Sequence, residues 1–190
     1  MARLVYMTIC SLDGYIEDTD GRFDWAEPDD EVHAFANDLA RPVGTHLYGR
    51  GMYETMAAWQ EFGKDPGDPE PIREFAEIWR AAEKVVFSTT LGEVKTPRTR
   101  LLRDFDPGAV RSTVDAAERD VSVSGPGLAA EAIRAGIVDE LQMLIAPVVV
   151  GGGKPALPPG VRWDLELTEG GRFGSGFAFL RYVSSDSGSE

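Results

Sequence analysis

The sequence contains only one cysteine, Cys10, and only two histidines, His33 and His46, in 190 residues. A disulfide within the chain is therefore excluded, and no cysteine and histidine set for a zinc ion can be assembled, so we expect no metal. No apolar run approaches the roughly 18 residues that a membrane-spanning helix needs. The chain passes from Met1 directly into a strand-like run rather than a secretory signal, and we expect a cytoplasmic protein.

The sequence is also poor in positive charge, because 19 lysines and arginines face 32 acidic residues, for a formal net charge of −13. A surface this acidic repels phosphate backbones and anionic membranes, so we expect neither nucleic acid nor a membrane as a partner. A small anionic ligand needs only a local positive pocket and stays a candidate. The length fits one domain over residues 1–183, followed by a polar tail, 184–190, that we expect to be disordered.

Short apolar runs alternate with stretches of helical periodicity along the chain. Leu4 to Ile9 predicts a central strand, and after possible caps at Asp29 and Asp30 apolar residues recur at the spacing of a helix. Further strands are expected at 45–48, 84–88, 100–105, 121–124 and 141–150, with helices between them, a place for a kink at Pro147 and a hairpin over 163–183. This alternation predicts an α/β fold of three layers, with a mixed, mainly parallel sheet, flanking helices and an antiparallel C-terminal hairpin.

In a sheet of this kind ligands bind beyond the carboxyl ends of the strands, and two turns there carry suitable residues. Gly49 and Arg50 begin a helix, where a guanidinium can pair with a phosphate. A solvent-exposed arginine in a tight turn is an equally good interpretation. Ser88 and Thr89 end another strand, and their hydroxyls suit a phosphate or a ribose, although such hydroxyls more often only cap turns.

A third turn, 124–129, is the strongest anion-binding pattern in the sequence. Its glycines, Gly125 and Gly127, leave backbone N–H groups free at the beginning of a helix, although Pro126 has none to offer. The pattern differs from the six-residue Rossmann glycine fingerprint, and we interpret it as a phosphate-binding turn. Lys154 follows three glycines and is a candidate for meeting an anionic substrate, while a flexible surface loop explains it equally well.

Four motifs occur together in one order: Ser-Leu-Asp-Gly-Tyr-Ile at 11–16, Tyr-Gly-Arg-Gly-Met-Tyr-Glu at 48–54, Val-Ser-Gly-Pro-Gly-Leu-Ala at 123–129 and Ala-Pro-Val-Val-Val-Gly-Gly-Gly-Lys-Pro at 146–155. Over about residues 2–183 the chain resembles the family of the riboflavin-biosynthesis reductase C-terminal domain, within the dihydrofolate-reductase-like superfamily. The resemblance implies the same layered fold, an NADPH cofactor lying across the strand ends and, in many members, a homodimer.

The resemblance also implies roles for individual residues. Gly49 and Arg50 would approach the adenosine 2′-phosphate, helped by Ser88 and Thr89. The pyrophosphate would be wrapped by the third turn, which consists of Ser124, Gly125, Pro126, Gly127, Leu128 and Ala129. On the substrate side the implied residues are Trp25, Asp13 and Lys154, with Asp30 as the acid that holds or protonates a heterocycle.

We therefore expect an NADPH-dependent reductase that transfers hydride to a small pterin-like, pyrimidine-like or carbonyl substrate. One alternative is the 5-amino-6-(5-phosphoribosylamino)uracil reductase of riboflavin biosynthesis. The other is a nucleotide-binding module without turnover.

Overall fold

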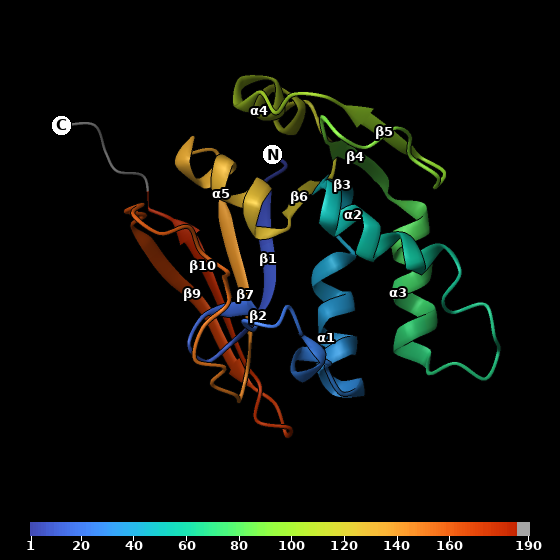
Figure 1. Cartoon of the computed structure of the whole chain (residues 1–190), viewed down its shortest axis with the longest axis vertical. Helices are drawn as coiled ribbons and strands as arrows, with labels where there is room; N and C mark the ends of the chain where they lie inside the picture. The colour runs from blue at the N-terminus through green and yellow to red at the C-terminus, as the bar shows by residue number, and fades with distance from the viewer. Residues whose placement is uncertain (186–190) are drawn as a thin grey trace.

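Apolar strands alternate with amphipathic helices over residues 1–185, which the computed structural model describes, and they build helical layers on both faces of a sheet (Figure 1). The strands are β1 (Leu4–Ser11), β2 (Tyr15–Glu17), β3 (Val43–Gly49), β4 (Glu83–Phe87), β5 (Thr99–Leu102), β6 (Asp120–Ser124), β7 (Glu140–Ala146), β8 (Lys154–Pro155), β9 (Leu165–Arg172) and β10 (Ala178–Ser184). The helices are α1 (Asp30–Ala40), α2 (Arg50–Met56), α3 (Glu70–Ala81), α4 (Pro107–Asp115) and α5 (Pro126–Arg134), with 3-10 turns η1 (Asp24–Ala26) and η2 (Ala57–Gln60).

The main sheet has eight strands in the order β5-β4-β3-β6-β1-β7-β10-β9. Every neighbouring pair from β5 to β7 is parallel, and β10 runs antiparallel to both β7 and β9. The predicted mainly parallel sheet with an antiparallel C-terminal hairpin is confirmed. Because the six parallel strands end at one edge, the turns that follow them lie along that carboxyl edge of the sheet.

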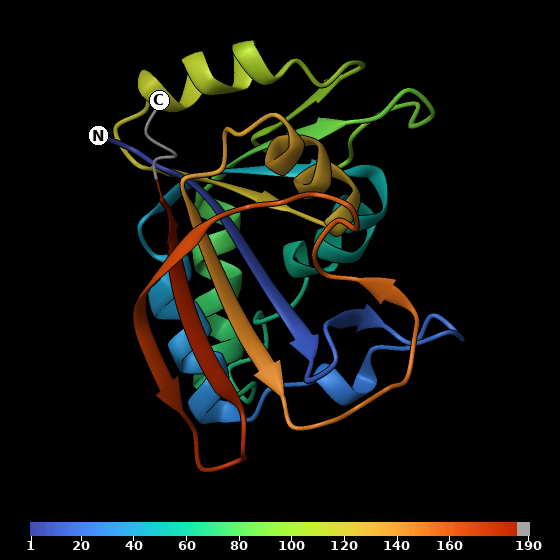
Figure 2. The ribbon, with the colours of Figure 1, turned by 90° about the vertical axis from the view of Figure 1, so that its left-hand side faces the viewer.

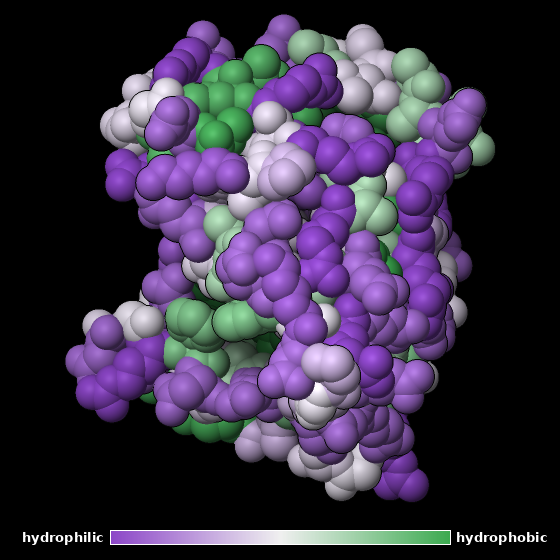
Figure 3. All heavy atoms as spheres, turned by 90° about the vertical axis from the view of Figure 1, so that its right-hand side faces the viewer, coloured by the Kyte–Doolittle hydropathy of each residue, from purple (hydrophilic) through white to green (hydrophobic). Residues whose placement is uncertain are grey.

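The two faces of the sheet are covered by different helices. α4 and α5 bury Val114, Ala129 and Ala132 against one face, where Tyr6 and Leu141 also lie. On the opposite face α1 packs into a separate cluster, whose buried residues are Val32, Ala36, Leu39, Leu144, Ala146, Phe177 and Phe179. Figure 3 shows a mainly hydrophilic exterior with apolar residues in the hollows, as the strong net charge leads one to expect. Within residues 1–185 no helix is long and apolar enough to cross a membrane.

Several predicted boundaries shift for identifiable reasons. The strand predicted over 141–150 ends at Ala146, because Pro147 cannot donate to the ladder and Val148 turns back to donate its N–H to the Ala146 carbonyl at 2.8 Å. The strand predicted over 100–105 ends at Leu102. The polar tail was predicted over 184–190, but Ser184 still belongs to β10. Residues 186–190 of that tail lie outside the described residues.

A small second sheet was not predicted. β2 and β8 pair antiparallel beyond the end of β1, where Figure 2 shows them side by side. The approach depends on glycine, since a Cβ on Gly153, whose φ is +136°, would lie 1.9 Å from the Glu17 carbonyl oxygen. Strands of three and two residues that pair across a long stretch of chain carry no periodic signal, which explains why the sequence did not reveal them.

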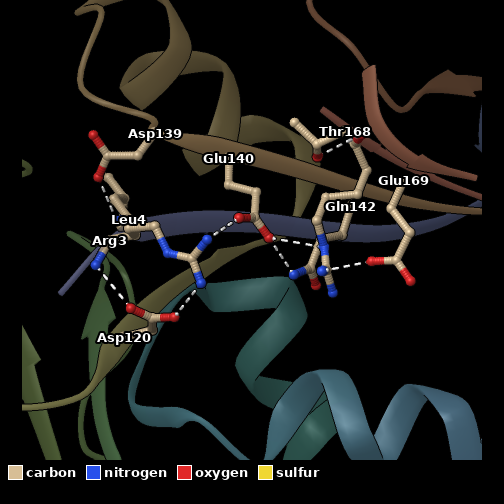
Figure 4. A network of polar contacts seen from close by, with 9 residues as sticks. Arg3, Leu4, Asp120, Asp139, Glu140, Gln142, Thr168 and Glu169 are labelled. Atoms are coloured by element: carbon tan, nitrogen blue, oxygen red, sulfur yellow. Dashed lines mark hydrogen bonds and ion pairs between the residues drawn. The ribbon is translucent and has the colours of Figure 1, made fainter. Parts of the chain in front are cut away.

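At the amino edge of the sheet, opposite the turns, five side chains form a line of alternating charge (Figure 4). Arg3 pairs with Asp120 at 3.0 Å and with Glu140, which is fully buried. Arg181 places Nε 3.3 Å from the Glu140 carboxylate and pairs with Glu169 on β9 at 2.6 Å. The network therefore connects β6, β7, β10 and β9.

Candidate cofactor and substrate site

An opening between two neighbouring strands defines the centre of the site. β1 pairs with β6 only over Leu4–Tyr6, whereas its pairing with β7 continues to Ser11. Because β6 ends at Ser124, no strand within residues 1–185 pairs with the side of β1 that faces β6 beyond Tyr6. This gap in the ladder lies at the edge where folds of this kind bind ligands.

The glycine turn after β6 lies beside this opening and leads into α5. Gly125 has a φ of +90°, and a Cβ there would come within 3.1 Å of the Met52 Cβ. Gly127 is exposed, and a Cβ on it would meet no atom within 4 Å. Pro126 lies in the first turn of α5, where a helix has no use for the missing N–H. The beginning of α5 thus presents uncovered backbone, as an anion would require.

The other residues of the predicted turn contribute less. The side chains of Ser124, Leu128 and Ala129 are all buried. The N–H of Ala129 is also occupied, because it donates to the Gly125 carbonyl at 3.0 Å. Of the six residues expected to wrap a pyrophosphate, Gly127 and Leu128 are therefore the ones whose N–H groups the first turn of the helix leaves free.

Arg50 begins α2 and reaches toward the turn after β4. Its Nη1 donates to Thr90 Oγ1 at 3.2 Å, while its Nε donates to Glu54 at 2.8 Å. The Ser88 hydroxyl accepts from the N–H groups of Thr90 and Leu91 at 3.2 and 3.0 Å, so it caps this turn. The structure brings Arg50 next to the turn that contains Ser88 and Thr89, and the hydroxyl that meets Arg50 belongs to Thr90, the neighbour of the predicted Thr89.

Lys154 lies near the glycine turn in space although 27 residues separate it from Gly127 in sequence. A cavity of about 210 Å³ has Pro126, Gly127, Arg134 and Lys154 among its lining residues. Lys154 Nζ is 3.2 Å from a Glu17 carboxylate oxygen, and both side chains are partly exposed. The wall of this cavity therefore combines free helix N–H groups with two cationic side chains.

Asp13, predicted to contact substrate, is engaged within the protein. Its carboxylate accepts the N–H groups of Val150 and Gly151 at 3.1 and 2.8 Å. The Ser11 hydroxyl, followed by these two N–H groups, lowers the pKa of Asp13 below its usual range. In this arrangement Asp13 joins the turn after β1 to the glycine segment before β8.

Three consecutive acids at the beginning of α1 have different surroundings. Asp29 caps the helix by accepting the Val32 N–H at 2.9 Å, and Glu31 accepts the Gly174 N–H at 3.1 Å. Within the described residues Asp30 makes no hydrogen bond or ion pair, and it is exposed. Trp25 is partly buried against the cluster under α1. Asp30 is thus the one acid of the three that is free to meet a ligand.

Comparison with known proteins agrees with this geometry. The family model of the RibD C-terminal domain matches residues 2–179. The chain belongs to this family. An uncharacterised protein of Bacillus subtilis (strain 168), YyaP, is 28% identical over 95% of this chain and 94% of its own length.

Two solved structures share the fold of this chain. A putative riboflavin biosynthesis protein from Shewanella sp. PV-4 superposes with a TM-score of 0.75 at 17% identity, covering 96% of this chain and 99% of that one. Dihydrofolate reductase from Enterococcus faecalis, solved with NADP(H), superposes with a TM-score of 0.65 at 15% identity, covering 97% of each chain. This RibD C-terminal domain therefore shares its fold with both proteins.

One candidate residue of this RibD C-terminal domain was missed at the sequence level. Arg103 Nη1 donates to the carbonyl oxygens of Ser88 and Leu91, at 3.0 and 2.6 Å, so a second guanidinium lies beside the turn that Arg50 contacts. Because the strand was expected to extend to 105, Arg103 was placed inside it. The end of β5 at Leu102 instead puts Arg103 at the carboxyl edge.

Proposed function

We propose that the protein is an NADPH-dependent reductase of a small heterocyclic or carbonyl substrate. The observation that carries the proposal is the opening beside β1, bordered by the uncovered turn of Gly125 to Gly127 after β6, with Arg50 and Arg103 farther along the same edge of the sheet, after β3 and β5. A dinucleotide is long and negatively charged at two places, and the site offers positive or N–H-rich groups at two separated places.

The space around Gly127 and the positions of Arg50 and Arg103 fit the charged groups of NADPH. A side chain on Gly127 would cover the N–H groups at the beginning of α5, and the open space there leaves room for a pyrophosphate. Arg50 and Arg103 supply the positive charge that distinguishes a 2′-phosphate from a hydroxyl. Phe87 and Leu102, which precede Ser88 and Arg103, line an apolar cavity of about 130 Å³, suited to a flat base.

When bound, NADPH supplies a hydride from its nicotinamide ring. The protein's own residues would orient the substrate against the free side of β1, exclude water with Trp25 and hold a proton at the Asp30 carboxyl. Lys154 and Arg134 would hold an anionic group of the substrate in the cavity beside Gly127. Positioning would supply most of the rate enhancement, and Asp30 about 10²- to 10⁴-fold.

Cofactor binding is tested by titrating the protein with NADPH and with NADH, followed by calorimetry. We expect Arg50→Ala to weaken NADPH by about 1–3 kcal/mol and to change NADH little, because only NADPH carries the extra phosphate. Arg162→Ala is the matched control, since the Arg162 side chain is 86% exposed and its ion pair within residues 1–185 is with Asp164. Equal losses for both cofactors, or no heat with either, would contradict the assignment.

Turnover is tested by following NADPH oxidation with a panel of pterins, pyrimidines and carbonyl compounds. Oxidation with one class, lost in Asp30→Asn while NADPH still binds, supports the reductase. Rescue of a strain that lacks the riboflavin-pathway reductase would assign the protein to that reaction, which the family match makes the second candidate. Binding without oxidation of any compound would leave a nucleotide-binding module.

A further inference from the structure

Arg50, which the proposed function assigns to the 2′-phosphate, has a carboxylate as its direct neighbour. Glu54 lies one turn later on α2 and accepts the Arg50 Nε–H at 2.8 Å. Both side chains are about half exposed, at 52% and 48%. A negative charge beside a phosphate-binding arginine repels the phosphate. Glu54 therefore weakens the site unless it gives Arg50 something that offsets this repulsion.

The stability of α2 does not account for the pair. Arg50 is the first residue of the helix, where the partial positive charge of the helix end disfavours a cation. The order of the two residues is also the weaker one, since a pair one turn apart stabilises a helix more when the acid precedes the base. An exposed ion pair of this kind contributes little to folding in any case. The pair is better explained by its place at the ligand-binding edge of the sheet.

A second contact holds the same guanidinium from the side of the sheet. Arg50 Nη1 donates to Thr90 Oγ1 at 3.2 Å. Thr90 is itself fixed, because its N–H donates to the Ser88 hydroxyl at 3.2 Å. Arg103 Nη1 braces this turn by donating to the carbonyl oxygens of Ser88 and Leu91, at 3.0 and 2.6 Å. Arg50 is thus tied to α2 through one nitrogen and to the turn after β4 through another.

Two contacts on different nitrogen atoms fix the direction in which the planar guanidinium faces. The group carries five N–H donors, and Glu54 and Thr90 occupy two of them. For the other three, including both N–H groups of Nη2, the structure describes no acceptor within residues 1–185. An arginine this exposed would otherwise sample many rotamers, and a phosphate would have to restrict it on binding. Contacts made before the phosphate arrives remove that cost.

From these observations we infer that Glu54 is a positioning residue that holds the Arg50 guanidinium ready for the 2′-phosphate, so that the preference for NADPH over NADH depends on Glu54. Glu54 acts through Arg50 and does not itself touch the cofactor. Its repulsion of the phosphate is screened, because both side chains lie in contact with solvent, whereas the rotamer freedom that it removes from Arg50 is not restored by solvent. The inference rests on the proposed function, which assigns the phosphate to Arg50.

The test compares Glu54→Gln with Glu54→Ala by calorimetry with NADPH and with NADH. Both variants lack the negative charge, but glutamine keeps an oxygen that can accept the Arg50 Nε–H, so the difference between them measures positioning alone. We expect Glu54→Ala to bind NADPH about fivefold more weakly than Glu54→Gln, and both to bind NADH alike. Glu54→Gln should bind NADPH at least as tightly as the parent protein. The same two substitutions at Glu77, an exposed acid on α3, are the control and should not differ.

The Nε–H signal of Arg50 in NMR spectra reports the contact itself without any cofactor, and its absence from Arg50→Ala assigns it. The signal should exchange slowly with water in the parent protein and in Glu54→Gln, and rapidly in Glu54→Ala. Rapid exchange in the parent protein would overturn the inference. Equal NADPH affinities of Glu54→Gln and Glu54→Ala would overturn it and leave the proposed function intact. A slow signal in a parent protein that binds no NADPH would overturn both, because the guanidinium would then be held for no phosphate.

Discussion

At the amino edge of the sheet the arginines lie against carboxylates, whereas at the carboxyl edge they lie mostly against hydroxyl and carbonyl oxygens. Glu140 is fully buried between Arg3 and Arg181, and this arrangement leaves little positive charge for a ligand. Arg103 contacts only backbone carbonyls, and Arg50 contacts one hydroxyl and one exposed carboxylate. The difference separates arginines that stabilise the sheet from arginines that we propose bind the anionic groups of a cofactor.

The largest effect is expected on stability, from a substitution that disrupts the ion pairs at the amino edge of the sheet. Glu140→Ala leaves Arg3 and Arg181 without their shared partner, and we expect a loss of about 3 kcal/mol in the free energy of unfolding, measured with urea. Glu169→Ala is the control, since that carboxylate is 47% exposed and its loss should cost below about 1 kcal/mol. Cofactor affinity should be the same in both variants; a change in it would mean that the two edges are coupled.

The next effect concerns pH and a histidine under α1 and α3. Burial, followed by the positive charges of Lys84 and Arg119, lowers the pKa of His46 to about 4. Its Nδ1 lies 2.6 Å from Ser122 Oγ. Because the unfolded chain takes up this proton near pH 6.5 and the folded protein only near pH 4, stability is lost as the pH falls between these values.

At pH 5 this loss should amount to about 2 kcal/mol relative to pH 7. Urea unfolding of His46→Gln at the two pH values measures it, since the variant should lose stability less steeply than the parent protein. Parallel slopes for the two proteins would show that His46 is not responsible.

The smallest effect is expected on NADPH affinity, from a substitution of Arg103 at the carboxyl edge of the sheet. Arg103→Ala should weaken NADPH about fivefold, roughly 1 kcal/mol, because Arg103 supports the turn and adds to the charge that Arg50 provides. NADH affinity and the urea midpoint should change little. A large loss of stability would place Arg103 among the structural arginines, as at the amino edge.

Much of the fold was predictable because its signals are local. The cap at Asp29 and the spacing of apolar residues defined α1, and the glycine turn before α5 marked a candidate anion site without any knowledge of its neighbours. The features that sequence reasoning missed depend on distant segments. In the sequence, Glu140 looks like a solvent-exposed acid in a turn before a strand. Only the structure shows that it is buried between Arg3 and Arg181.

In the candidate site, too, the sequence revealed residues with local signals but not the contacts between distant segments. Gly125, Arg50 and Lys154 were chosen from their own turns, and the structure brings them to one edge. Asp13 was chosen by its motif, but its carboxylate holds Val150 and Gly151, a contact across 137 residues or more. Motif position predicted that Asp13 lies near the site, and only the fold showed which atoms it touches.

The pairing of β1 with β6 ends at Tyr6, and this has a consequence for which residues can mutate when the substrate preference changes. Beyond Tyr6 the edge of β1 that faces β6 consists of main-chain atoms, which no substitution removes, whereas the residues that we propose contact substrate, Trp25, Asp30 and Lys154, act through their side chains. Selection in the laboratory for a new substrate should therefore collect its mutations at those residues and leave the edge of β1 unaltered. Such a division would allow one scaffold to change its substrate while it keeps the cofactor that we propose for it.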